Sequence, residues 1–154
     1  MANYIKPTFT LTANKNTVTS GNKGPLSIAL ALNASDLLSV YNVRSEIVKV
    51  PDTSGGGVVA TMLVDGSAYM GATGAAGTDG GFIYLKNIHA TVNIMIGVAN
   101  ENLSSDDEAD RLMTLQPGEF AWMPWDCSQD IYVDANGTGT SGLETWVFIR
   151  TGTA

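Results

Sequence analysis

The segment 91-TVNIMIGVA-99 is the clearest indication of the fold in this chain. Val92, Ile94, Ile96 and Val98 occupy every second position, and side chains of a β-strand alternate between the two faces of its sheet. β-Branched residues also fit the pleated surface of a strand. The segment therefore predicts a strand with a bulky face turned toward a core.

Similar runs extend from this segment toward both ends of the chain. They follow one another at intervals of about 8 to 15 residues and are separated by turns that contain Gly and Pro. Neither a long helix nor an internal repeat is predicted. The pattern predicts an all-β fold, an antiparallel β-sandwich or jelly roll. The expected runs are 27–32, 40–50, 58–64, 67–70, 82–85, 112–115, 120–123, 131–134 and 145–150.

Three connections have sequences that predict their geometry. The tetrapeptide 116-QPGE-119 has Pro at its second and Gly at its third position, which is typical of a type II turn. The pair Asp65-Gly66 predicts a two-residue hairpin between the runs on either side of it. The small residues from Gly71 to Gly81 predict a glycine-rich linker within the sandwich.

Residues 1–25 form a separate kind of segment, polar and rich in Thr, which we interpret as an extended N-terminal arm before a β-sandwich domain at 26–154. Ordering the backbone of such an arm costs roughly 20 to 40 kcal/mol. Burying its few apolar side chains returns only about 8 to 15 kcal/mol. The arm therefore needs the edge of a sheet, its own or a neighbour's. Its interface candidates are Tyr4, Ile5, Phe9 and Leu11.

Composition excludes several classes of protein. The chain has 154 residues, which fits one domain, and its net charge is −7 with only eight Lys and Arg. These cations are scattered, so nucleic-acid binding is not expected. No apolar run approaches a membrane span and no signal peptide is expected at Met1. A charged fraction of 15% is low and favours surfaces that become interfaces.

The residues that carry chemistry in enzymes are few. His89 is the only histidine and Cys127 the only cysteine, so neither a histidine triad nor an internal disulfide is possible. The acidic segment 101–110 is compatible with calcium, although it lacks EF-hand spacing and equally fits a solvated loop. We therefore expect no enzymatic activity, no catalytic residue, no metal and no cofactor.

Large aromatic residues gather in the last third of the chain. As a group they favour the core, while exposed rings would suit sugar stacking or a protein contact. Trp125 differs because it follows Pro124 in an expected loop, and we predict that it lies at an interface. The group contains Phe120, Trp122, Trp125, Tyr132, Trp146 and Phe148.

The segment 115-LQPGEFAWMP-124 resembles the turn and strand of cupin-like jelly rolls. The cupin metal motif requires several histidines and a glutamate on two strands. With one histidine, this chain resembles the scaffold without the metal site.

The arm at 1–25, the linker at 71–81 and the runs 82–87, 111–120 and 144–149 together resemble the decoration or cement proteins of tailed phages. The resemblance implies a β-domain, often a homotrimer, that binds the major capsid protein or another virion protein and reinforces the shell. It also implies a place in the virion, after assembly in the host cytoplasm, with which a lone thiol agrees.

Two other functions also fit the sequence. Within the same class, the chain fits a tail, neck or fibre component of the virion. In a different class, it fits a carbohydrate-binding jelly-roll module that uses its aromatic rings.

Overall fold

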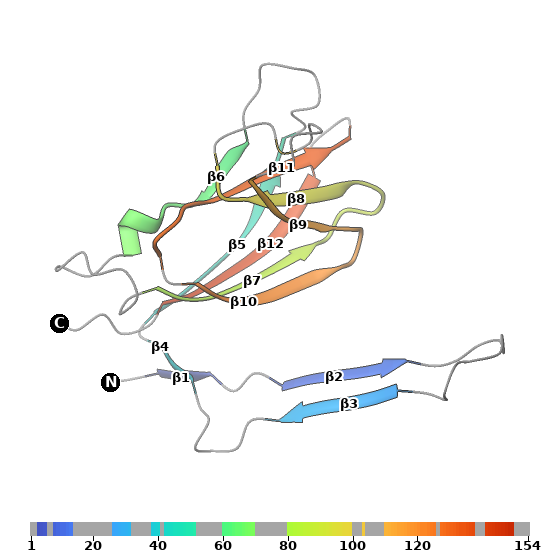
Figure 1. Cartoon of the computed structure of the whole chain (residues 1–154), viewed down its shortest axis with the longest axis vertical. Helices are drawn as coiled ribbons and strands as arrows, with labels where there is room; N and C mark the ends of the chain where they lie inside the picture. The colour runs from blue at the N-terminus through green and yellow to red at the C-terminus, as the bar shows by residue number, and fades with distance from the viewer. Residues whose placement is uncertain are drawn as a thin grey trace, which may run out of the picture. The chain divides into compact units, whose positions relative to one another are not determined.

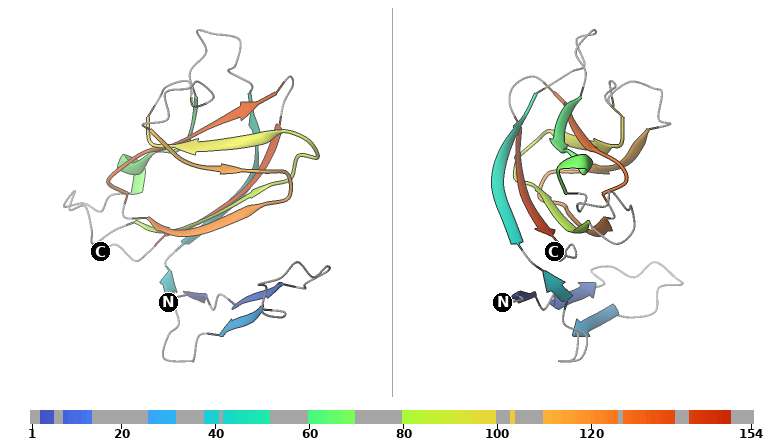
Figure 2. Two further views of the ribbon diagram at one scale, coloured as in Figure 1. Left: turned by 45° about the vertical axis from the view of Figure 1, so that its right-hand side comes forward. Right: turned by 90° about the vertical axis from the view of Figure 1, so that its left-hand side faces the viewer.

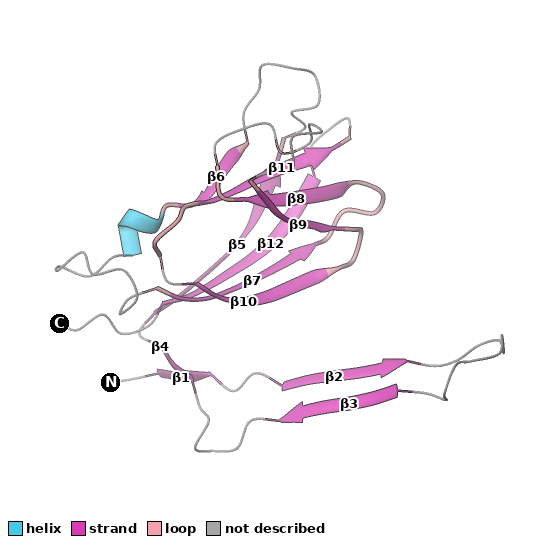
Figure 3. Cartoon of the chain, in the orientation of Figure 1, coloured by secondary structure: helices cyan, strands magenta, loops and turns pink. Residues whose placement is uncertain are grey.

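The structure is a computed structural model that describes residues 3–5, 8–13, 26–31, 38–40, 42–51, 60–69, 80–99, 103, 110–125, 127–137 and 141–149. Its contacts divide the chain into two units, Met1–Ser39 and Val40–Ala154. Figure 1 labels their strands, and Figure 3 shows that strand is by far the commonest described element. The all-β prediction is confirmed.

The N-terminal unit is built from short strand pairs. β2 (Thr8–Ala13) and β3 (Leu26–Ala31) pair antiparallel, with Phe9 opposite Leu30. β1 (Asn3–Ile5) pairs with β4 (Leu38–Val40). The sequence placed the domain boundary after residue 25, whereas the contacts place it after Ser39, so β3 is grouped with the N-terminal unit.

The second unit is an antiparallel sandwich of two four-stranded sheets, which Figure 2 shows as facing layers. One sheet has the order β10-β7-β12-β5 and the other β6-β11-β8-β9. The pairs β5–β12, β6–β11, β7–β10 and β8–β9 are nested, as in one long hairpin rolled into two layers, and this is a jelly roll. The strands are β5 (Asn42–Val50), β6 (Thr61–Val64), β7 (Gly81–Asn87), β8 (Asn93–Gly97), β9 (Arg111–Leu115), β10 (Phe120–Trp125), β11 (Ile131–Asn136) and β12 (Ser141–Ile149).

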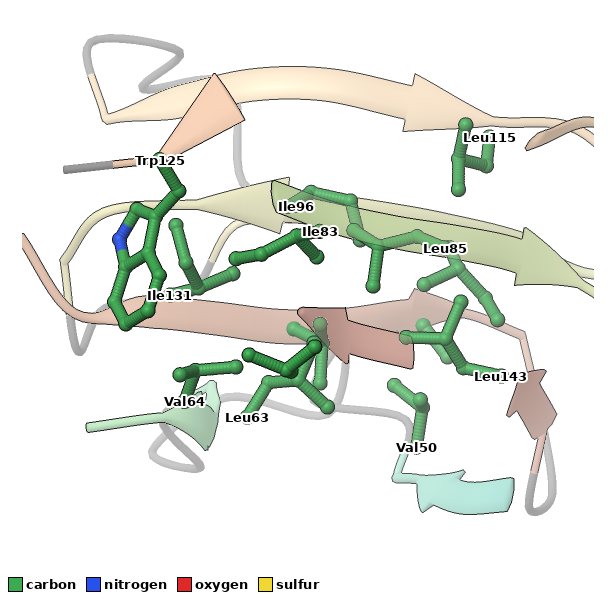
Figure 4. Packing of buried hydrophobic residues seen from close by; sticks show 14 of the residues in the cluster. Val50, Leu63, Val64, Ile83, Leu85, Ile96, Leu115, Trp125, Ile131 and Leu143 are labelled. Atoms are coloured by element: carbon green, nitrogen blue, oxygen red, sulfur yellow. The ribbon is translucent and has the colours of Figure 1, made fainter. Parts of the chain in front are cut away.

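The core lies between the two sheets, where the labelled side chains of Figure 4 meet. Ile83 and Leu85 of β7 face it from one layer, and Ile94 and Ile96 of β8 belong to the same cluster; all four are fully buried. The alternation of Ile94 and Ile96 in the segment 91–99 thus marks the core face of β8. Met95, on the opposite face of that strand, is also buried, in a small cluster with Ala60 and Leu103.

Two of the predicted turns have different outcomes. Gly118 has φ of 81° and the Glu119 amide donates to the Gln116 carbonyl at 2.9 Å, so the type II turn is confirmed. The hairpin at Asp65 is wrong, because a 3-10 helix, η2 (Gly66–Tyr69), begins there. The Asp65 carboxylate accepts hydrogen bonds from the Ser67 amide at 2.9 Å and hydroxyl at 2.7 Å, which favours a helical turn over a strand. The Ser67 hydroxyl also lowers the pKa of Asp65.

Asn87, the last residue of β7, joins the two sheets through a fully buried side chain. Its Nδ2 donates to the carbonyl of Leu115 in the opposite sheet at 2.9 Å. The same Nδ2 donates to the carbonyl of Val92, which directly precedes β8 of that sheet, at 2.8 Å. Its Oδ1 accepts from the His89 amide at 2.9 Å. The Asn87 main chain also bonds to the turn, with the Gly118 amide donating to its carbonyl. The side-chain amide thus satisfies three main-chain groups at the β7 end of the sandwich.

We expect Asn87→Ala to lower the free energy of unfolding by about 2 to 4 kcal/mol, because one buried carbonyl, one partly buried carbonyl and one amide lose their partner. Urea denaturation followed by tryptophan fluorescence measures this change. Asn136→Ala, at an exposed position of β11, is the matched control and should change stability by no more than about 0.5 kcal/mol. Equal losses in the two variants would show that Asn87 does not hold the sheets together.

Candidate functional site

The outer face of the β10-β7-β12-β5 sheet carries six aromatic residues, which we call the aromatic face. The strand register places them in neighbouring rows, since residues directly opposite each other share a face of the sheet. Trp122, Tyr84 and Trp146 lie opposite one another across three strands, and Phe82 lies opposite Phe148. Phe120 completes the set at the start of β10.

The rings of the aromatic face contact one another in two groups. Trp122 stacks on Phe82 with 5.5 Å between ring centroids and meets Phe148 at 5.1 Å. Phe148 in turn stacks on Trp146 at 6.2 Å. Phe120 and Tyr84 form the second group, at 6.0 Å. Distances of this size are favourable for aromatic pairs.

Much of this surface is open to solvent. Phe120 is 54% exposed and Trp146 38%, and β5 adds Val43 at 38% and Ile47 at 67% on the same side of the sheet. The sequence favoured the core for the aromatic residues as a group, and this is wrong for Phe120 and Trp146. The reason is the strand alternation, which places Phe120 of β10 and Trp146 of β12 on the outer face of the sheet.

One acidic group lies within the aromatic face. The Trp146 indole donates its Nε1 proton to Glu144 Oε1 at 3.0 Å. Burial, followed by the negative charge of Glu144, raises the pKa of the Tyr84 phenol, so this tyrosine stays neutral at physiological pH. The face therefore combines apolar rings with a single carboxylate and with Lys86, which lies opposite both Glu144 and Phe120.

Trp125 has a different position from the one that the sequence predicted. Instead of lying in a loop, it is the last residue of β10, and its side chain is only 7% exposed within the core cluster. β10 continues through Pro124 because it is an edge strand, where a residue without an amide proton is tolerated. The Trp125 indole donates to the Gln129 carbonyl at 2.9 Å, so its polar group has a partner.

An open apolar pocket of about 420 Å³ lies beside Trp125. Its walls come from both sheets and include Leu112 of β9, Met123 of β10 and Ile131 of β11. None of the described residues that line it is charged. Such a pocket fits an apolar side chain better than a polar substrate.

His89 and Cys127, the only histidine and the only cysteine of the chain, both occupy positions that support the fold. His89 Nδ1 accepts hydrogen bonds from the Val92 amide at 3.0 Å and the Thr91 amide at 3.2 Å, so it organises the loop between β7 and β8. Cys127 is fully buried within the core cluster, where its thiol is shielded from solvent. Neither arrangement is that of an activated nucleophile.

Most of the predicted acidic segment, including Glu101 and Asp106 to Glu108, lies outside the described residues, as do residues 71–79 of the linker. In the part of the chain that is described, no group of three or more His, Cys, Asp or Glu side chains could hold a metal ion. The same part contains no helix long and apolar enough to cross a membrane.

The four interface candidates of the arm fall on two strands of the N-terminal unit. Tyr4 and Ile5 belong to β1, and Phe9 and Leu11 belong to β2. In the β2–β3 register Phe9 lies opposite Leu30 and Leu11 opposite Ile28.

Comparison with known proteins identifies no relative: no family model and no curated protein sequence matches the chain. The geometry therefore defines the class, an antiparallel jelly roll with an aromatic outer face.

Sequence reasoning did not place Tyr84, Val43 or Ile47 on the outer face of the sheet. The available signal was the period of two in β12, where Leu143, Thr145 and Val147 alternate with Trp146 and Phe148. That alternation separates an aliphatic from an aromatic face, but both faces are apolar enough to be a core.

We expect the double variant Phe120→Ser, Trp146→Ser to reduce the fluorescence of a bound hydrophobic dye, since dye binding reports exposed apolar surface. Each substitution removes an aromatic pair, which is worth about 0.5 to 1.5 kcal/mol of unfolding free energy beyond the area that it buries. Leu143→Ala, in the buried face of β12, is the contrasting variant and should cost about 2 to 5 kcal/mol. Unchanged dye binding in the double variant would contradict an exposed aromatic face.

Proposed function

We propose that this chain is a non-enzymatic structural protein that works by binding another protein through its aromatic face. The observation that carries the proposal is the exposure of Phe120 and Trp146, one in each of the two groups of contacting rings on the outer face of the sheet. Monomeric proteins rarely leave large apolar patches in water, and aromatic residues dominate the energetics of protein interfaces. The low charged fraction of the chain supports the same function.

The more specific proposal is an accessory virion protein of a tailed phage, a cement or decoration protein that binds the capsid surface as an oligomer and stabilises the shell. Jelly rolls recur among viral capsid domains, which supports this reading beside the sequence resemblance. A homotrimer, the oligomer that the resemblance implies, would turn one weak contact per chain into a tight attachment. The partner would be the major capsid protein or another virion protein, with a tail, neck or fibre position as the alternative.

A carbohydrate-binding module is the second candidate, because an exposed tryptophan beside a carboxylate also suits a sugar ring. Trp146 and Glu144 have this arrangement at 3.0 Å, and lectins include jelly rolls. Glu144 keeps acceptor sites on both oxygens after accepting the indole proton, so a glycan-binding assay separates this candidate from the protein-binding one.

We expect the purified chain to cosediment, in many copies per shell, with shells assembled from the major capsid protein of the phage that carries it. The double variant Phe120→Ser, Trp146→Ser should bind at least about tenfold more weakly, because loss of aromatic anchors costs more than 1 kcal/mol at most interfaces. Met62→Ser is the matched control, since Met62 is 49% exposed but belongs to the other sheet.

Two results would decide against the proposal. If the double variant cosediments to the same extent as the wild type, the aromatic face is not the binding surface. Absence of the chain from shells and tails, together with binding to a glycan array, would establish the carbohydrate-binding module instead.

A further inference from the structure

A small hollow lies where β5 and β12 run side by side, and we call it the Trp146 hollow. Its volume is about 180 Å³, and it is lined by Trp146 and Glu144 of β12 and by Ser45, Glu46 and Ile47 of β5. In the strand register Trp146 lies opposite Ser45 and Glu144 lies opposite Ile47, so these four side chains share the outer face of the sheet. Trp146, Ile47 and Ser45 are exposed, so the hollow is open to solvent.

The indole of Trp146 is positioned by two contacts and still faces water. Its Nε1 donates to Glu144 Oε1 at 3.0 Å, and its ring stacks on Phe148 at 6.2 Å with 16° between the two planes. Even so, 38% of the residue is exposed. An aromatic face attracts cations, and tryptophan does so more strongly than tyrosine or phenylalanine. The hollow therefore has one wall that suits a cation.

The Glu144 carboxylate gives the hollow a negative charge. It has about four acceptor sites, of which the indole proton takes one. In the part of the chain that the structure describes, Glu144 forms no ion pair, although Lys86 lies opposite it in the register. Glu46 differs, because its Oε1 lies 2.8 Å from Nη2 of Arg44. Glu144 is therefore the acid of the hollow that is available to a cation from outside the chain.

The combination of an indole and a carboxylate favours a guanidinium group. Guanidinium is planar, stacks on aromatic rings and donates parallel hydrogen bonds to carboxylates. Arginine is also enriched in protein interfaces, whereas lysine is depleted. Pockets for drug-sized ligands measure roughly 300 to 1,000 Å³, so this smaller hollow suits the end of one side chain. The net charge of −7 likewise favours a partner that presents a positive group.

We propose that the Trp146 hollow binds the guanidinium group of an arginine on the partner protein. The guanidinium lies against the indole of Trp146 and donates to Glu144, while Ile47 packs against the aliphatic stem of the arginine. A directional contact of this kind fixes the orientation of the partner on an otherwise apolar face. The inference rests on the proposed function, since it names the group by which the aromatic face recognises its partner.

A pair of small probes tests the chemistry of the hollow. N-acetyl-arginine amide carries the guanidinium, and N-acetyl-citrulline amide is its uncharged counterpart of nearly the same shape. Proton–nitrogen correlation NMR follows the indole signals, and the signal of Trp146 is the one missing from Trp146→Phe. The arginine probe should shift this signal saturably, and the citrulline probe should bind at least about tenfold more weakly. The signal of buried Trp125 should not move.

Two matched variants test the assignment to Glu144. Glu144→Gln keeps an oxygen for the indole proton but removes the charge, so it should weaken binding of the arginine probe at least about tenfold. Glu46→Gln is the control, because the charge of Glu46 is already paired with Arg44, and it should change the affinity by no more than about threefold. An unmoved Trp146 signal in the probe-free variants shows that the hollow keeps its structure.

Equal affinity for the two probes, or equal losses in Glu144→Gln and Glu46→Gln, would overturn the proposal. A saturable shift with methyl glucoside and none with the arginine probe would replace it by the carbohydrate reading. Cosedimentation with capsid shells, measured separately, distinguishes this inference from the proposed function. If Glu144→Gln binds shells like the wild type while the Phe120→Ser, Trp146→Ser variant does not, the arginine contact is wrong and the function of the aromatic face stands.

Discussion

The buried amide of Asn87 is the interaction on which the sandwich depends. A two-layer β fold must satisfy every main-chain group at the ends of its strands, where ladder hydrogen bonds stop. Asn87 does this across the layers, because one side-chain nitrogen serves the carbonyls of Leu115 and Val92 while its oxygen serves the His89 amide. The end of β7 is thereby held against the opposite sheet, and the type II turn at Gly118 is held to the Asn87 main chain.

With the layers held in this way, strand alternation decides whether a side chain points into the core or to the outer face of its sheet. The inner faces of β7 and β12 carry aliphatic residues such as Leu85 and Val147, which fill the space between the sheets. The outer faces of the same strands then present aromatic residues such as Trp146, with no layer of the sandwich to cover them. The aromatic face is thus a direct consequence of having two apolar faces on one sheet. A protein with such a sheet gains stability when a partner covers the second face. The aromatic face is apolar, which suits affinity for a partner protein.

Local patterns determined much of this structure. The period of two in residues 91–99, the Pro117-Gly118 pair and the glycine-punctuated runs predicted the strands, a turn and the all-β class, because these signals act within a few residues of one another. The Asp65-Gly66 pair predicted a hairpin, whereas the structure has a 3-10 helix there. The same residues suit both, because the Asp65 side chain can cap a helical turn as well as begin a hairpin turn. Only the tertiary structure decided that Trp125 is buried while Phe120 and Trp146 are exposed, because both faces of β10 and β12 are apolar. Which face of a strand becomes the core depends on the sheet opposite it, and that pairing joins residues far apart in the chain.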